Sequence, residues 1–445
     1  MLLEFTVENF LSYKGKNTLS MIATKGKDKK DIQIIEVKGI EILKNAAIYG
    51  ANASGKTAII EAAVFMKEFI INSSKQTQEG ENIFYYPFKL NTESIKKPSL
   101  FEIIFELNDV VYRYGFEVNS ENVVSEWLFG RYTSRESLLF LRKDDNGKVE
   151  VKIGAKFKEG NRVSEFVRKN ALMLSVCAQF NGEISSSILN WFSNFNMIMT
   201  GDKNGEKISW DILENLDGKY DEEQKMLIKL IQKSDFGIKE ISVRESQGPD
   251  FKKFKESLNP KQKKNLENMI SGQLKALENS ESYKINLKNI NIKTEHAIFD
   301  SEGNHVENMT FELLEESQGT KRVFELLGPI IYTLKNNGVL FIDEIQNNIH
   351  TKLLVELIKT LMCNKADSRA QFIFTTHDVN FLNYGLFRRD QYWFVEKNKY
   401  GESELTSLVD FDEHVRKDAN IYKDYLRGRY GAIPYTKLGD SYGEC

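Results

Sequence analysis

The sequence predicts an α/β fold with a mostly parallel sheet, an antiparallel β-meander subdomain and an inserted helical lobe. Three patterns predict it. An apolar run, Ala46-Ala47-Ile48-Tyr49, leads directly into a glycine-bounded loop. Residues 99–133 alternate apolar and polar side chains between turn signals, which is typical of an antiparallel meander. From residue 319 onward helical and apolar strand patterns alternate, and this alternation is the repeating unit of a parallel sheet.

Length and charge define the class of protein. With 445 residues the chain exceeds what one hydrophobic core usually organises, so we expect two lobes. A hydrophobic share of 41% and only 6 prolines suit a packed globular protein and exclude a disordered or fibrous one. Because 61 Lys and Arg oppose 64 Asp and Glu, no global positive field attracts nucleic acid, and any such contact must be local.

Cysteine spacing and hydropathy predict a cytoplasmic protein. Cys177, Cys363 and Cys445 are too far apart in sequence for a zinc motif or a disulfide framework, which suits a reducing compartment. No segment approaches the ~20 apolar residues that cross a bilayer, and the opening residues lack a basic leader region. We therefore expect no export and no membrane association.

The order of patterns predicts a head assembled from both ends of the chain. Residues 1–150 are expected to form its N-terminal half with the meander, and residues 301–445 its C-terminal half. Residues 151–300 are polar and lysine-rich and are expected to form an inserted, mainly helical lobe. No apolar heptad persists there, so a long coiled-coil rod is not expected.

The strongest motif is Gly50-Ala51-Asn52-Ala53-Ser54-Gly55-Lys56-Thr57, which fits the Walker A pattern between a predicted strand and a predicted helix, Ala58 to Ile70. Backbone N–H groups of such a loop wrap phosphates, the lysine reaches the β and γ oxygens, and the threonine hydroxyl coordinates Mg²⁺. We therefore expect ATP and Mg²⁺ as ligands. The residues expected to contact them here are Gly50, Asn52, Ser54, Gly55, Lys56, Thr57 and Ala58.

Two further apolar strands are expected to end beside this loop. The strand at 339–342 is followed by Asp343, which would hold the Mg²⁺ shell, and by Glu344, which would orient and activate the attacking water. The strand at 372–376 is followed by His377, which is expected near the γ-phosphate because parallel sheets bind ligands beyond the carboxyl ends of their strands.

A fourth segment, Glu316-Ser317-Gln318-Gly319-Thr320, precedes the predicted helix that leads to the 339–342 strand. Ser317 suits the N-cap of that helix, and Gly319 permits close approach of the backbone to a ligand. The residues alone do not decide whether this segment caps the helix or contacts a ligand.

With these motifs the sequence resembles the ABC/SMC superfamily of ATPases, and more closely the compact bacterial AAA proteins related to OLD-like and abortive-infection ATPases. The likeness rests on the opening strand ending Glu8-Asn9-Phe10, the Walker A loop, Ser317-Gln318-Gly319 in the signature position, Asp343-Glu344, Asn347-Asn348-Ile349-His350 in the D-loop position and Thr376-His377-Asp378 in the switch-histidine position. It implies a head-to-tail homodimer, or a higher even-numbered oligomer, in which Ser317 and Gly319 of one protomer cap the γ-phosphate held by the other.

The resemblance also implies that ATP hydrolysis controls a separate effector, a TOPRIM-like nuclease or a toxin, in anti-phage defence by abortive infection. The alternative is an SMC-like DNA repair or maintenance ATPase that binds nucleic acid directly. Two departures stand out: the signature has Ser-Gln-Gly where the family has Ser-Gly-Gly, and the glutamine loop is unassigned, with Gln76 and Gln78 as candidates.

Three rival functions are weighed against this one. Asn364-Lys365-Ala366-Asp367 matches a guanine-reading tetrapeptide, but it follows an amphipathic segment and not the apolar strand that a GTPase requires. A module that binds ATP without hydrolysing it would leave Glu344 without a role. Direct nucleic-acid processing would use the lysines between Lys252 and Lys264 with Phe251 and Phe254, but a solvated helix face is the favoured explanation of this cluster.

Overall fold

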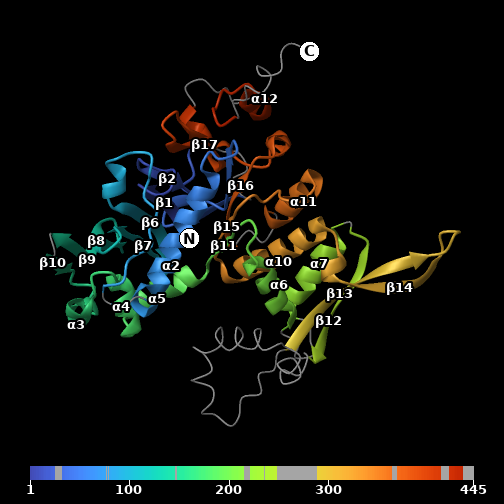
Figure 1. Cartoon of the computed structure of the whole chain (residues 1–445), viewed down its shortest axis with the longest axis horizontal. Coiled ribbons are helices and arrows are strands. Elements are labelled where there is room, and N and C mark those ends of the chain that lie inside the picture. The colour runs from blue at the N-terminus through green and yellow to red at the C-terminus, as the bar shows by residue number, and fades with distance from the viewer. Residues whose placement is uncertain are drawn as a thin grey trace, which may run out of the picture. The chain divides into compact units, whose positions relative to one another are not determined.

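A computed structural model describes the chain except for residues 26–32, 77, 79, 146–147, 215–220, 235, 248–287, 363–367, 412–419 and 434–445. The chain divides into two compact units. Met1–Gly205 and Pro329–Cys445 form the first, here called the head unit, and Glu206–Gly328 form the second, the inserted unit (Figure 1).

The centre of the head unit is a six-stranded sheet in the order β11-β15-β16-β5-β17-β18. These strands are β11 (Phe195–Ile198), β15 (Val339–Ile342), β16 (Gln371–Thr376), β5 (Asn45–Gly50), β17 (Tyr392–Lys397) and β18 (Ser403–Ser407). All neighbours are parallel except β18, which is antiparallel to β17. Every residue of β5, β15 and β16 is buried, which explains their apolar sequences, and their carboxyl ends share one edge of the sheet.

A seven-stranded antiparallel sheet forms the other layer of the head unit, in the order β10-β9-β8-β7-β6-β1-β2. Its members are β1 (Leu2–Glu8), β2 (Asn17–Ser20), β6 (Ser99–Leu107), β7 (Val110–Val118), β8 (Val123–Arg131), β9 (Glu136–Asp145) and β10 (Lys148–Ile153). The predicted meander is therefore confirmed, and two strands beyond residue 133 extend it. Strands β3 (Ile34–Val37) and β4 (Ile40–Leu43) pair with each other and form a separate two-stranded sheet.

Helix α2 (Lys56–Gln76) connects these layers, because it contacts β1 of the antiparallel sheet and β5 and β11 of the parallel sheet (Figure 1). It also packs against α4 (Met173–Gln179) and α5 (Glu183–Ser193). Among the described residues the head unit also contains the helices α3 (Gly160–Val163), α11 (Thr351–Met362) and α12 (Ile421–Leu426). In the part of the chain that the structure describes, no helix combines the length and apolarity that a membrane crossing requires.

The inserted unit differs in extent and content from the lobe expected at 151–300. Residues 151–205 belong to the head unit. Besides α6 (Asn204–Glu214) and α7 (Glu222–Gln232), the insert contains an antiparallel sheet of β12 (Ile238–Gln247), β13 (Lys288–Phe299) and β14 (His305–Glu312). Strand β14 gives no sequence signal, because all of its residues are exposed and no buried face imposes an alternation of apolar and polar residues.

Helix α10 (Gln318–Asn336) begins in the inserted unit and continues into the head unit. Gly328 N donates to Ser209 Oγ at 3.0 Å, and Ser209 Oγ donates to the carbonyl of Phe324. The serine hydroxyl thus enters the helical hydrogen-bond ladder one residue before Pro329. A Cβ at Gly328 would lie 2.4 Å from the backbone nitrogen of Ser209, so only glycine permits this close packing of α6 on α10.

Candidate nucleotide-binding site

The loop between β5 and α2 has the backbone of a phosphate cradle. Ala53 and Gly55 have φ angles of 61° and 113°, which turn the chain sharply into the N-terminus of α2. A Cβ on Gly55 would lie 2.3 Å from Ser403 Oγ, and one on Gly50 would lie 2.5 Å from Ser54 Oγ. Both glycines are therefore required by the close contacts of the loop, and the N-terminal end of a long helix faces whatever the loop encloses.

Neighbouring strands hold the outside of this loop. Tyr13 donates its hydroxyl proton to the Gly55 carbonyl at 3.1 Å, and Ser403 donates to the Ser54 carbonyl. On the inside, Lys56 Nζ donates to the carbonyls of Gly50 and Ala51 at 2.8 and 2.9 Å. Burial lowers the pKa of Lys56, although the nearby carboxylates of Glu344 and Asp343 oppose that shift. The Lys56 ammonium therefore bonds to carbonyls of its own loop.

Asp343 is the most heavily bonded side chain of the site. It is 3% exposed at the end of β15, and three threonine hydroxyls reach its carboxylate. The Thr375 hydroxyl is 2.8 Å from Oδ1, the Thr57 hydroxyl is 3.2 Å from Oδ1, and the Thr200 hydroxyl is 3.3 Å from Oδ2. Thr57 and Asp343, predicted to share a metal ion, therefore lie in contact. Their hard oxygen atoms are the donors that Mg²⁺ prefers, so the site fits that ion.

Glu344 and His377 extend from the adjoining strand ends. Glu344 has a φ of 46°, an uncommon value for a residue with a side chain, and its N–H donates to Thr375 Oγ1 at 2.8 Å. His377 Nδ1 lies 2.9 Å from Gln346 Nε2. Donation from this amide places the ring proton on Nε2, where it is available to an anionic ligand.

These residues share a pocket of about 730 Å³. Of the predicted residues, Asn52, Ser54, Gly55, Lys56, Thr57, Ala58, Glu344 and His377 line it. Gly50 instead lines a second pocket of about 830 Å³ on the other side of the loop, which His377 also borders. The wall of the first pocket also includes Tyr86, Lys89, Leu90 and Lys397. The structure thus places the Walker A loop, Glu344 and His377 around one cavity, with Asp343 bonded to Thr57 beneath it.

Ser317 and Gly319 lie at the start of α10 in the inserted unit. Ser317 Oγ accepts from the Thr320 N–H at 3.1 Å, so the predicted N-cap is confirmed. Ser317 and Gln318 are nevertheless exposed. Contact of Ser317 and Gly319 with a nucleotide stays a prediction.

Several site residues were not predicted from sequence. Thr375 precedes the recognised Thr376-His377 pair, Gln346 follows the recognised Asp343-Glu344 pair, and Glu61 lies one helical turn after Thr57 in the same pocket. Burial and the charge of Asp343 raise the pKa of Glu61. These positions could have been found from their spacing to known motifs.

The candidates for the glutamine loop were wrong. Gln76 ends α2, so its backbone is about 30 Å from Lys56 at the rise of an α-helix, and Gln78 follows it. The carboxyl end of β11, beside β15, carries Thr200 instead. Asn196 interrupts the apolar residues of β11 and two of its four residues are only partly buried, so no continuous apolar run distinguished it.

Two rival motifs fall outside the described residues. They are the Asn364-Lys365-Ala366-Asp367 tetrapeptide and the lysine cluster between Lys252 and Lys264.

Comparison with known proteins assigns the family. The profile of the AAA_21 family, described as "AAA domain, putative AbiEii toxin, Type IV TA system", matches residues 46–383, well over half of the chain. No curated protein matches the sequence. This family match confirms the predicted P-loop ATPase resemblance.

Two solved structures are similar. The SMC head domain from Thermotoga maritima has a TM-score of 0.38 and 12% identity, covering 91% of this chain and 98% of that one. An SMC head bound to the C-terminal winged-helix domain of ScpA has a TM-score of 0.43 and 14% identity, covering 91% and 97%.

The hydrogen bonds of Thr375 predict a measurable loss of stability when its hydroxyl is removed. Thr375→Val removes the donor to Asp343 and the acceptor for the Glu344 N–H, and we expect the free energy of unfolding to fall by about 1–3 kcal/mol. Thr333→Val is the matched control, because Thr333 is fully buried and its hydroxyl has no partner among the described residues. Denaturant unfolding of both full-length variants provides the measurement. Equal losses in the two variants would contradict the assigned bonds.

Proposed function

Since this chain belongs to the AAA_21 family of AAA domains, we propose that it binds ATP with Mg²⁺ and hydrolyses it to ADP and phosphate. One observation carries the proposal: Lys56, Glu344 and His377 face one pocket, while the Thr57 hydroxyl is 3.2 Å from Asp343. A phosphate cradle, a metal-binding pair and a carboxylate for the water thus occupy adjacent positions. These are the parts that phosphoryl transfer requires.

Each residue has a role in this reaction. The N–H groups of the loop and the Lys56 ammonium bind the β- and γ-phosphate oxygens, and phosphate replaces the carbonyls that Lys56 now contacts. Thr57 and Asp343 hold Mg²⁺, which neutralises charge on the phosphates when bound. Glu344 accepts a proton from the attacking water as the water oxygen bonds to the γ-phosphorus and the bond to the β–γ bridging oxygen breaks. His377 donates from Nε2 to a γ-phosphate oxygen.

The pocket is completed by a second copy in this proposal. Ser317 is exposed at the N-terminus of α10, and its hydroxyl and the following N–H groups of the helix suit a phosphate oxygen. The resemblance to ABC/SMC ATPases supports the same arrangement, in which two chains pair head to tail and each supplies Ser317 and Gly319 to the nucleotide of the other.

The family description supports a role in defence. It names a toxin of a type IV toxin–antitoxin system. We propose that closing and opening of the ATP-bound pair, in the cytoplasm, controls a separate effector, a TOPRIM-like nuclease or a toxin, during abortive infection.

Replacing the proposed base separates hydrolysis from binding. Glu344→Gln keeps the size of the side chain but cannot accept the proton, so hydrolysis should fall roughly 10²–10⁴-fold while ATP binding persists and an ATP-dependent dimer accumulates. Lys56→Ala should abolish binding. Glu68→Gln is the matched control, since Glu68 is exposed on α2 outside the pocket and should retain turnover. Phosphate release and light scattering measure both effects, and unchanged hydrolysis in Glu344→Gln refutes the assigned base.

The composite pocket can be tested without disturbing α10. Ser317→Asn and Ser317→Asp both keep a good N-cap, but only the aspartate places a negative charge against the γ-phosphate. We expect ATP-dependent dimerisation to be lost in Ser317→Asp and kept in Ser317→Asn. Mixing Ser317→Asp with Lys56→Ala should restore activity, because one pocket of the mixed dimer then has both intact halves. Absence of restoration argues for a pocket that is complete within one chain.

The defence role predicts a phenotype. In cells that carry this chain with the reading frames beside it, Lys56→Ala should remove protection from phage, because the effector loses its control by ATP. Plaque counts measure protection, and an unchanged count in Lys56→Ala would exclude a role for ATP binding in defence.

A further inference from the structure

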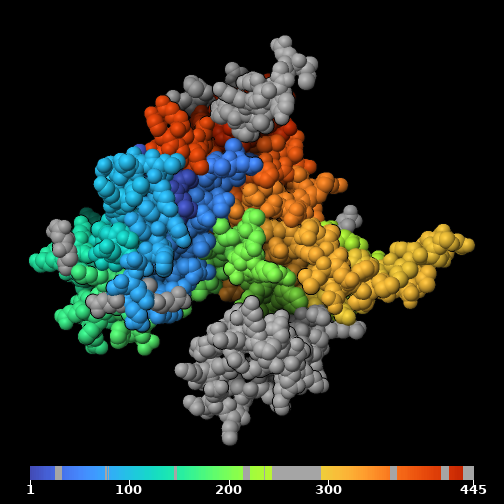
Figure 2. All heavy atoms as spheres, in the orientation of Figure 1, coloured from blue at the N-terminus to red at the C-terminus, as the bar shows by residue number. Residues whose placement is uncertain are grey.

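Strands β13 and β14 with their turn form an arm that extends from the inserted unit (Figure 2). β14 is the edge strand of its sheet and is exposed at all positions, so among the described residues no part of its own unit buries it. An exposed edge strand offers unpaired backbone groups and free side chains to another molecule. The arm is therefore a candidate interaction surface.

The arm combines acidic and apolar side chains. Residues 294–316, here called the hairpin segment, contain seven acidic residues and no lysine or arginine. The acidic residues are Glu295, Asp300, Glu302, Glu307, Glu312, Glu315 and Glu316. Exposed apolar side chains lie among them at Phe299, Val306, Met309, Phe311 and Leu314. Since this charge repels nucleic acid, the surface suits a basic and partly apolar protein.

A surface of that description exists on the head unit. The wall of the nucleotide pocket includes Tyr86, Lys89, Leu90 and Lys397, here called the pocket rim. Both lysines are exposed, as are Tyr86 at 51% and Leu90 at 71%. The rim is thus basic and apolar where the hairpin segment is acidic and apolar.

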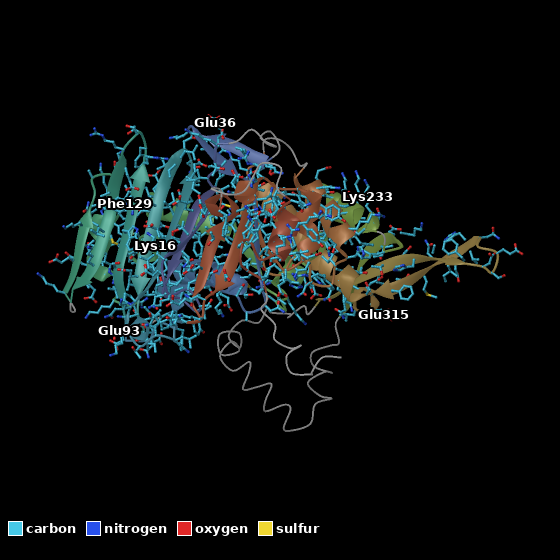
Figure 3. The ribbon with its side chains drawn as sticks, turned by 90° about the horizontal axis from the view of Figure 1, so that it is seen from above. Lys16, Glu36, Glu93, Phe129, Lys233 and Glu315 are labelled. Atoms are coloured by element: carbon cyan, nitrogen blue, oxygen red, sulfur yellow. The ribbon has the colours of Figure 1, made fainter. Side chains whose placement is uncertain are left out.

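In a pair of copies, the short chain segment between the hairpin and Ser317 limits how far the hairpin segment can lie from the pocket that Ser317 enters. Only four residues, 313–316, separate β14 from Ser317, and Glu315 lies at the base of the arm (Figure 3). That separation is less than about 20 Å even for extended chain. If Ser317 binds the nucleotide of a second copy, the base of the hairpin segment lies within about 20 Å of that same pocket, and the rim is the part of its wall that is complementary in charge.

We propose that the hairpin segment of one copy docks on the pocket rim of a second copy when ATP closes the pair. This inference rests on the proposed head-to-tail dimer and names a surface that stabilises it. Docking of β14 on the β14 of a second copy is disfavoured, because it would bring two acidic segments together.

Charge exchange tests the contact in the Glu344→Gln background, where the ATP-dependent dimer is expected to accumulate. The hairpin variant carries Glu302→Lys and Glu307→Lys, and the rim variant carries Lys89→Glu and Lys397→Glu. Each alone should weaken ATP-dependent dimerisation about tenfold or more. An equimolar mixture of the two should regain it, and so should one chain carrying all four changes, because opposite charges meet again. Analytical ultracentrifugation with and without ATP measures the dimer.

The control matched to the hairpin variant carries Glu121→Lys and Glu165→Lys, which make the same change in net charge as that variant at exposed sites of the head unit and should leave dimerisation unchanged. The affinity of each variant for a fluorescent ATP analogue is measured at concentrations where the chain is monomeric. Loss of that affinity in the rim variant would assign the lysines to nucleotide and overturn the docking proposal.

The outcomes separate this inference from the proposed function. If the Glu344→Gln parent forms no ATP-dependent dimer, the proposed dimer itself fails. If the parent dimerises and the hairpin and rim variants dimerise equally well, the docking contact is refuted but the dimer is not. The same conclusion follows if the chain that carries all four changes does not regain ATP-dependent dimerisation. Loss of phage protection in the hairpin variant with normal dimerisation would assign the arm to the effector and would also overturn docking between copies.

Discussion

The site depends on one buried carboxylate. Asp343 is almost excluded from water, and hydroxyls from Thr57, Thr200 and Thr375 reach it from three other segments of the chain. A buried carboxylate requires such donors, since an unpaired charge in that position would be strongly destabilising. The hydrogen bonds to Asp343 therefore hold three segments in fixed positions relative to β15: the start of α2 after the phosphate loop, the residues after the edge strand β11, and the end of β16. The geometry of Thr57 and Asp343, the pair proposed to hold Mg²⁺, is thus set by the fold before a ligand arrives, as preorganised electrostatic catalysis would require.

The same constraint explains where backbone strain lies. Glu344 follows Asp343 directly, and a φ of 46° turns its side chain into the pocket while its N–H bonds Thr375. A continued strand would alternate and direct Glu344 away from the face that Asp343 occupies. The positive φ is thus the means by which two consecutive carboxylates serve one site. Positive φ angles at Ala53 and Gly55 likewise redirect the chain, in this case from the phosphate loop into the N-terminus of α2.

Sequence predicted the parts of this molecule that bury a face. The apolar runs of β5, β15 and β16 predicted a parallel sheet, and the side chains that follow each run predicted Lys56, Glu344 and His377. Thr200 escaped prediction because Asn196 interrupts the apolar residues of the strand before it and because its hydroxyl bonds Asp343 only through tertiary folding. Strand β14 of the inserted unit escaped for a different reason. A strand that buries neither face has no periodic pattern, so its sequence resembles a polar loop.

The proposed pair also limits its own size. A chain that donates one surface and receives through another can form open filaments, unless a two-fold axis lets each copy donate and receive at once. Ser317 and the hairpin segment are the donating surface here, and the nucleotide pocket with its rim is the receiving one. In a two-fold pair both surfaces of both copies are covered, so association stops at two. In this proposal ATP strengthens closure, because its phosphates would be the shared partner of Lys56 in one chain and Ser317 in the other, and hydrolysis would remove the γ-phosphate that connects them.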